Sequence, residues 1–301
     1  MAFSAESEPV AGYRLLRRLG TGGFGEVWAA TAPDGAEVAL KFLDTRNRDA
    51  TLLRSEVQLL SSIRDLHHPN LIRLRDVFTS SRHLVLCMDK ADGNLDELRE
   101  AYRQEIGGNI PPDHLLELLR QAAVGLDYLA NMRLPGFTMT LQGLQHCDVK
   151  PTNLLLQGDE VKIADFGLCA GMGQQNRKGM RGTPPFAAPE LYQGRVCAQT
   201  DQYALAVSWC DLVGGSRMFR KGIAPDGGPM YSINLALSRE REAAVLARAL
   251  HDDPTRRYSS CVEFVDALRD AARMPRRPAG KWLRSVLSRS RAADGAVAAA
   301  K

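Results

Sequence analysis

A glycine cluster between two apolar segments restricts the fold of this chain most strongly. Gly20, Gly22 and Gly25 follow the apolar run 13–19 and precede the run 26–30. Apolar runs on both sides of a glycine-rich turn predict a β-hairpin. A dinucleotide-binding fold requires a helix after such glycines, so the second strand argues against that fold. Glycines in a hairpin let backbone N–H groups approach phosphate oxygens, although an ordinary flexible turn is the alternative interpretation.

The hydrophobic spacing changes near residue 90. Before that point, apolar runs predict strands at 38–43, 71–77 and 84–88, with a helix over 49–63. After it, helical spacing predominates, with Asp113 as a candidate N-cap, in the segments 113–129, 201–213, 240–250 and 259–272. The sequence therefore predicts an α+β fold with a small β-rich lobe that has one helix and a larger, mostly helical lobe.

Composition, charge and cysteine content indicate the general class of the protein. Of the 301 residues, 45% are hydrophobic and 25% are charged, which is typical of a globular chain with its own core. The net charge of +4 gives no sign of nucleic-acid binding. Six cysteines without a C-x-x-C pair favour thiols in a reducing compartment, so we expect a cytoplasmic protein.

The basic residues gather in the C-terminal tail. Residues 274–301 hold seven basic side chains and one acid, a balance of +6, which leaves −2 for the rest of the chain. Between Lys281 and Arg291, apolar and basic residues alternate. This pattern predicts weak contact with an anionic membrane or a partner, and a solvated linker is the alternative. Nothing in the sequence indicates the oligomeric state.

Two charged residues of the first lobe are candidates for an ion pair. Lys41 follows the apolar run Val38-Ala39-Leu40, where a buried cation needs a carboxylate or phosphate partner. Glu56 is the one acid in the helical pattern 51–63 and has apolar neighbours. We expect the two to pair, and a surface position for Glu56 is the alternative.

A second group of polar residues surrounds an apolar strand in the helical lobe. Asp148, Lys150 and Asn153 precede this strand, and Asp165 follows it. Asp148 is a candidate acceptor for a hydroxyl proton, while Asn153 and Asp165 offer the oxygen ligands that Mg²⁺ prefers. Each of these residues taken alone also suits a turn.

In chain order, these motifs resemble the signature of the eukaryotic-type protein kinases, and of bacterial members in particular. The series is the glycine loop, V-A-L-K, a helix glutamate, H-C-D-V-K-P-T-N, D-F-G and A-P-E, over about residues 13–270. The resemblance implies the bilobal protein kinase fold over residues 12–273, with an N-lobe at 12–90 and a C-lobe at 91–273. Residues 1–11 would then be an N-terminal segment and 274–301 a basic tail or linker.

The resemblance also implies roles for individual residues, with ATP and Mg²⁺ as cofactors. Lys41, held by Glu56, would contact the α and β phosphates, and Asn153 and Asp165 would hold Mg²⁺. Asp148 would orient and deprotonate the acceptor hydroxyl, and Lys150 would steady the γ-phosphate. The other residues implied in nucleotide binding are Gly20, Thr21, Gly22, Gly23, Phe24, Gly25, Val27, Ala39, Met88, Asp89, Ala91 and Leu155.

The same resemblance indicates the acceptor and the supporting residues. Lys150 and Thr183 match the serine/threonine pattern, which implies transfer of the γ-phosphate of Mg-ATP to Ser or Thr of a protein substrate. Asp201 would hold the catalytic loop, and Arg257 would pair with Glu190 unless it is a solvated surface arginine. A nucleotide-binding pseudokinase scaffold and a small-molecule phosphotransferase are the alternatives.

One departure from the family pattern concerns regulation. Cys147 stands where most members have an arginine that binds an activation-loop phosphate, and residues 168–182 contain no Ser, Thr or Tyr. We therefore expect a kinase whose activity is independent of activation-loop phosphorylation. Cys147 and Cys169 are either redox-sensitive thiols or small buried residues.

Overall fold

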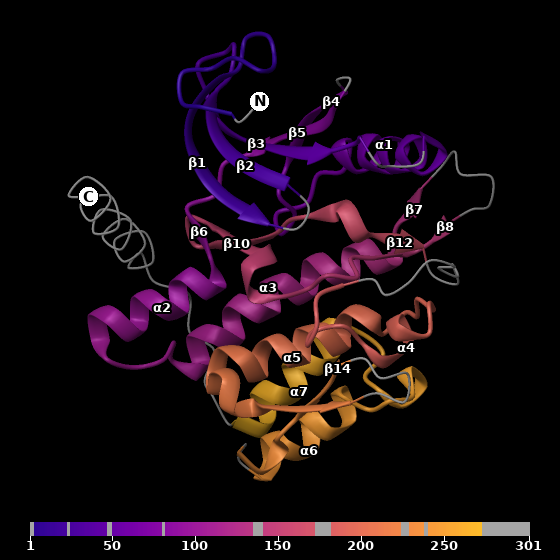
Figure 1. Ribbon diagram of the computed structural model, residues 1–301. Helices are drawn as coiled ribbons and strands as arrows, with labels where there is room; N and C mark the ends of the chain where they lie inside the picture. The colour runs from indigo at the N-terminus through magenta and orange to yellow at the C-terminus, as the bar shows by residue number, and fades with distance from the viewer. Residues whose placement is uncertain are drawn as a thin grey trace. The chain divides into compact units, whose positions relative to one another are not determined.

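The computed structural model describes residues 3–22, 25–46, 50–79, 82–134, 141–171, 182–223, 229–237 and 240–272. The chain forms two compact units, Met1–Ala91 and Asp92–Lys301 (Figure 1). Among the described helices, none is both long and apolar enough to cross a bilayer.

The N-terminal unit is an antiparallel five-stranded sheet with one helix. The strand order is β1-β2-β3-β5-β4, so β3 pairs with β5 across the segment that holds α1 and β4, and the other neighbours are consecutive in the chain (Figure 1). The elements are β1 (Arg14–Gly22), β2 (Gly25–Thr31), β3 (Glu37–Asp44), α1 (Ala50–Arg64), β4 (Leu74–Thr79) and β5 (His83–Asp89).

One face of this sheet is buried beneath the N-terminal residues of the chain. Its apolar cluster consists of Leu15, Trp28, Ala30, Ala32, Val38, Leu40, Phe42, Val85 and Cys87. Phe3 lies on Phe42, with ring centroids 4.1 Å apart, and Tyr13 contacts Phe78 edge-on at 5.3 Å. Because side chains alternate along a strand, the residues between those of the cluster point to the opposite face.

The C-terminal unit is mostly helical. Its helices are α2 (Leu95–Ile106), α3 (Pro112–Asn131), α4 (Pro189–Tyr192), α5 (Thr200–Gly214), α6 (Glu240–Ala249) and α7 (Cys261–Ala272). Its strands are short: β6 (Gly93–Asn94), β7 (Arg133–Leu134), β8 (Leu141–Gln142), β9 (Leu144–Gln145), β10 (Leu154–Gln157), β11 (Glu160–Ile163), β12 (Ala170–Gly171), β13 (Phe219–Ile223) and β14 (Pro229–Ile233). Helix α5 is buried over most of its length, which makes it the centre of this unit.

The structure contains helix α2 and the hairpin β13–β14, which the sequence pattern does not predict. The side chain of Asn94 caps α2 by accepting hydrogen bonds from the N–H groups of Asp96 and Glu97, each at 3.0 Å. Gly107, at φ +69°, ends the helix in the left-handed conformation. The expected N-cap at Asp113 is wrong by two positions, because α3 begins at Pro112 and its cap is Pro111.

A buried ion pair joins α4 to the turn before α7. Two guanidinium nitrogens of Arg257 donate to the two carboxylate oxygens of Glu190, each at 2.8 Å, and the side chains are 0% and 1% exposed. The hydroxyl of Thr200 donates to the same carboxylate at 2.9 Å. The expected pairing is confirmed, and a solvated position for Arg257 is excluded.

We predict that Arg257→Ala lowers the free energy of unfolding by about 3–5 kcal/mol, because it leaves the buried Glu190 carboxylate without its counter-charge. Arg256, the exposed neighbour, is a matched control, and Arg256→Ala should change stability by less than about 0.5 kcal/mol. Urea unfolding followed by circular dichroism measures both values. Equal losses in the two variants would contradict the role assigned to the pair.

Candidate active site

The carboxylate of Asp148 lies at the centre of the candidate site in the C-terminal unit. Its side chain is 1% exposed, and each of its oxygens accepts hydrogen bonds. Oδ1 accepts from the hydroxyl of Thr183 at 2.7 Å, and Oδ2 accepts from Lys150 Nζ at 2.9 Å and from Asn153 Nδ2 at 3.0 Å. Lys150 also donates to the Thr183 hydroxyl at 2.7 Å. Four residues that the sequence analysis selected are thus in direct contact.

Asp201 holds the backbone that carries Asp148. Its carboxylate accepts from the N–H of His146 at 2.6 Å and from the N–H of Cys147 at 2.8 Å. Cys147 has φ +64°, a conformation that costs a non-glycine residue about 1–3 kcal/mol. Complete burial raises the pKa of the Asp201 carboxyl above its ordinary value, and His146 and the two N–H donors oppose that shift.

Gly182 is a supporting residue that the sequence analysis did not select. Its φ is +92°, and a Cβ at this position would lie 2.7 Å from the carbonyl oxygen of Cys147. Only glycine permits this close approach, which sets Thr183 beside Asp148. The available signal was a glycine directly before the threonine.

The donor chemistry of Asn153 and Asp165 fits a divalent cation. Because the amide nitrogen of Asn153 donates to the backbone and side chain of Asp148, its Oδ1 is the atom left for a ligand. Asp165 lies two residues after the end of β11. It is half-buried and has φ +71°. Its neighbour Phe166 contacts the ring of the buried His146, at 5.8 Å between centroids. Carboxylate and amide oxygens are the ligands that Mg²⁺ prefers.

The N-terminal unit places its predicted site residues on the sheet face opposite the apolar cluster. Val27 pairs directly with Lys41, and Ala39 pairs directly with Met88, so these four side chains share one face. Lys41 is 8% exposed, which agrees with the expected burial of this cation. Glu56 is half-buried on α1.

The glycine loop forms the predicted hairpin between β1 and β2. Gly20 and Thr21 pair with Val27 and Glu26 near the end of β1, and Gly22, its last residue, pairs with Gly25 across the turn. Gly25 has φ +137°, and a Cβ there would lie 1.8 Å from the carbonyl oxygen of Phe42, so only glycine fits. The two residues at the tip, Gly23 and Phe24, lie outside the described residues.

The remaining predicted nucleotide contacts are divided between the two units. Asp89 ends β5, where its N–H donates to the carbonyl of Arg73 at 3.0 Å and its carboxylate accepts from Arg75 at 2.5 Å. Ala91 is half-buried and is the last residue of the N-terminal unit. Leu155 lies on β10 of the C-terminal unit, paired with Lys162.

Comparisons with known proteins agree with this geometry. The family described as protein kinase domain matches residues 13–272. The serine/threonine-protein kinase PknF of Mycobacterium tuberculosis is 29% identical over 295 residues, which cover 88% of this chain and 57% of PknF. Serine/threonine-protein kinase 36 of Pongo abelii is 30% identical over 187 residues, 61% of this chain and 13% of that protein. The chain therefore spans a small part to just over half of these relatives.

A solved structure shows the same fold. The kinase domain of PknI from Mycobacterium tuberculosis superposes with a TM-score of 0.69 at 29% identity, covering 91% of this chain and all of that domain. The resemblance read from the ordered motifs and the bilobal α+β fold are confirmed. The chain belongs to the protein kinase domain family.

Proposed function

We propose that the protein transfers the γ-phosphate of Mg-ATP to Ser or Thr hydroxyls of a protein substrate. The observation that carries this proposal is the buried Asp148 carboxylate with an alcohol, the Thr183 hydroxyl, at 2.7 Å and a lysine ammonium at 2.9 Å. A carboxylate in hydrogen-bond reach of an alcohol is the arrangement that a general base needs. The serine/threonine kinases among the relatives support this choice of acceptor.

Each residue of the site has a role in this proposal. Asp148 orients the incoming hydroxyl and accepts its proton, and Lys150 places positive charge beside the transferred phosphoryl group. Lys41 binds the α and β phosphates of ATP. Asn153 and Asp165 hold Mg²⁺, which when bound neutralises charge on the phosphate oxygens.

We predict that Asp148→Asn lowers kcat by about 10²–10⁴-fold, because the amide cannot accept the hydroxyl proton. Asp270→Asn changes an exposed residue of α7 in the same way and should leave kcat unchanged. The assay uses γ-labelled ATP, Mg²⁺ and generic peptides with Ser/Thr or Tyr acceptors.

The same assay separates the proposal from the other functions. Nucleotide binding by the wild type without transfer to any acceptor would identify a pseudokinase scaffold. Transfer in the Asp148→Asn variant at the wild-type rate would remove Asp148 from the mechanism. Labelling of small alcohols but of no peptide would indicate a small-molecule phosphotransferase.

We also propose that activity does not depend on a phosphate in the activation loop. Residues 168–182 contain no hydroxyl side chain that can carry one. Cys147 is 2% exposed and packs with apolar residues such as Ala170 and Val207, so its thiol offers no positive charge to a phosphate. Cys169 is also buried, at 6% exposed, which favours a packing role for both thiols over a redox role.

We predict that exhaustive phosphatase treatment, followed by removal of the phosphatase, leaves kcat within about twofold of the untreated value, because no loop phosphate orders the site. Mass spectrometry of the treated protein verifies that phosphate has been removed. A loss of more than tenfold that is restored by preincubation with Mg-ATP would contradict this mode of control.

We also propose a cytoplasmic location for the protein and a weak binding role for its C-terminal tail. The six cysteines are thiols, five of them buried, which supports a reducing compartment such as the cytoplasm. Residues 274–301 lie outside the described residues, and their weak contact with an anionic membrane or a partner rests on the basic and apolar pattern alone.

A further inference from the structure

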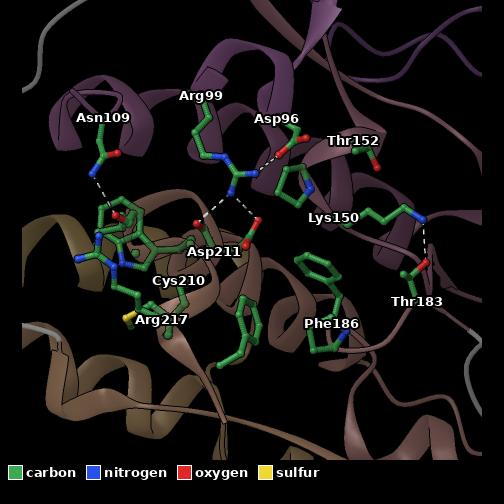
Figure 2. Close-up of a pocket in the computed structure, with 18 of the residues that line it drawn as sticks. Asp96, Arg99, Asn109, Lys150, Thr152, Thr183, Phe186, Cys210, Asp211 and Arg217 are labelled. Atoms are coloured by element: carbon green, nitrogen blue, oxygen red, sulfur yellow. Dashed lines mark hydrogen bonds and ion pairs between the residues drawn. The ribbon is translucent and has the colours of Figure 1, made fainter. Parts of the chain in front are cut away.

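A large pocket in the C-terminal unit opens beside Lys150 and Thr183 (Figure 2). Its volume is about 1360 Å³. Its walls come from α2, residues 150–152, the segment 183–186, α5 and the turn Gly215–Met218. On one side, Phe186 contacts Phe219 edge-on, with ring centroids 6.3 Å apart. A polypeptide whose hydroxyl reaches Asp148 has this pocket next to it.

The acidic side chains of the pocket are already neutralised or buried. Arg99 forms ion pairs with both Asp96 and Asp211, the second at 3.0 Å (Figure 2). The same guanidinium donates to the backbone carbonyl of Asp211 at 3.2 Å. Glu242, the third acid, is only 9% exposed. A cationic side chain of a substrate therefore meets carboxylates that are held by Arg99 or covered.

Two other arginines of the pocket are exposed. Arg103 on α2 is 44% exposed and forms one ion pair, at 3.9 Å, with Glu100 on the same helix, which is 55% exposed. Arg217 is exposed and forms no ion pair with any residue that the structure describes. A nitrogen of Arg103 lies 3.3 Å from the position that a Cβ of Gly215 would take, two residues before Arg217. Arg103 and Arg217 thus come from elements that meet at Gly215, and both line the pocket.

We propose that Arg103 and Arg217 select substrates that carry an anionic side chain, a carboxylate or a phosphate, a few residues from the acceptor Ser or Thr. This inference rests on the proposed kinase function. Guanidinium groups bind carboxylate and phosphate through paired hydrogen bonds, so two of them in the pocket that flanks the acceptor site discriminate by charge. Arg217 lies across the pocket from Lys150 and Thr183, where a residue some positions away from the acceptor reaches it (Figure 2). The occupant of the pocket is the extended segment of the substrate that flanks the acceptor.

The expected effect is moderate because both arginines are exposed. Exposed ion pairs contribute modestly, so two of them predict a preference of about 2- to 30-fold in kcat/KM for Glu over Ala at the selected position. The preference resides mainly in KM, since these contacts form equally in the ground state and the transition state. Added salt should weaken it.

The test is a set of peptides with one acceptor Ser and, at each flanking position in turn, Glu, phosphoserine, Ala or Lys. Wild type should favour Glu or phosphoserine over Ala, and Ala over Lys, at one or two positions. The arms with Glu and phosphoserine show which anion is preferred. Arg103→Glu with Arg217→Glu should reverse the order so that Lys is favoured at the same positions, whereas the exposed Arg256→Glu should leave it unchanged.

The outcomes separate the two proposals. Transfer to peptides with no preference for an anion, or a preference that survives in the Arg103→Glu and Arg217→Glu variant, overturns the selection proposed here and leaves the kinase function standing. Single variants, Arg103→Gln and Arg217→Gln, should each lose part of the preference with normal kcat and an unchanged melting temperature. Failure of the wild type to label any peptide overturns the proposed function and this inference together.

Discussion

The geometry of the candidate site depends on the hydrogen bonds between the Asp201 carboxylate and two consecutive backbone N–H groups, those of His146 and Cys147. These bonds hold Cys147 in the left-handed conformation, which a β-carbon disfavours. Because the turn at Cys147 sets the direction of the next residue, it also sets where the Asp148 carboxylate points. Helix α5, which carries Asp201, is buried over most of its length and is therefore a firm base for this contact.

The buried charges of the C-terminal unit divide into an ion pair that supports the fold and a carboxylate to which the proposed function assigns the reaction. Glu190 and Arg257 satisfy one another away from solvent and join segments that are distant in sequence. Asp148, by contrast, shares its hydrogen bonds with Lys150 and Thr183, which line the pocket. In the proposed function the substrate hydroxyl approaches from that side, so a rigid support lies behind a carboxylate whose partners face the pocket.

Much of the site was predictable from the sequence because its residues lie in short motifs. Asp148, Lys150 and Asn153 lie within six consecutive positions, and the glycines between positions 20 and 25 mark the β1–β2 hairpin. The pocket residues were not predictable in this way. Arg103 and Arg217 are 114 positions apart, and only the packing of their elements around Gly215 relates them.

Helix α2 and the hairpin β13–β14 were not predicted from the sequence, for a similar physical reason. Helix α2 has a low mean hydropathy and an exposed outer face, so its apolar positions are few, although the Asn94 cap and Gly107 marked its ends. The hairpin β13–β14 pairs residues across a connection whose sequence resembles a loop. In both cases, the element is defined more by contacts that form on folding than by a hydrophobic periodicity in the sequence.

The most direct measurement compares the kcat and the ATP dissociation constant of wild type with those of Asp201→Asn, with exposed Asp270→Asn as the control. An asparagine oxygen accepts from one of the two N–H groups and turns an amide N–H toward the other, so the loop loses a charge-assisted hydrogen bond. We expect kcat to fall by at least about tenfold, while the ATP dissociation constant changes by less than about twofold. An unchanged kcat, or a loss of ATP affinity with kcat at saturation preserved, would contradict the account.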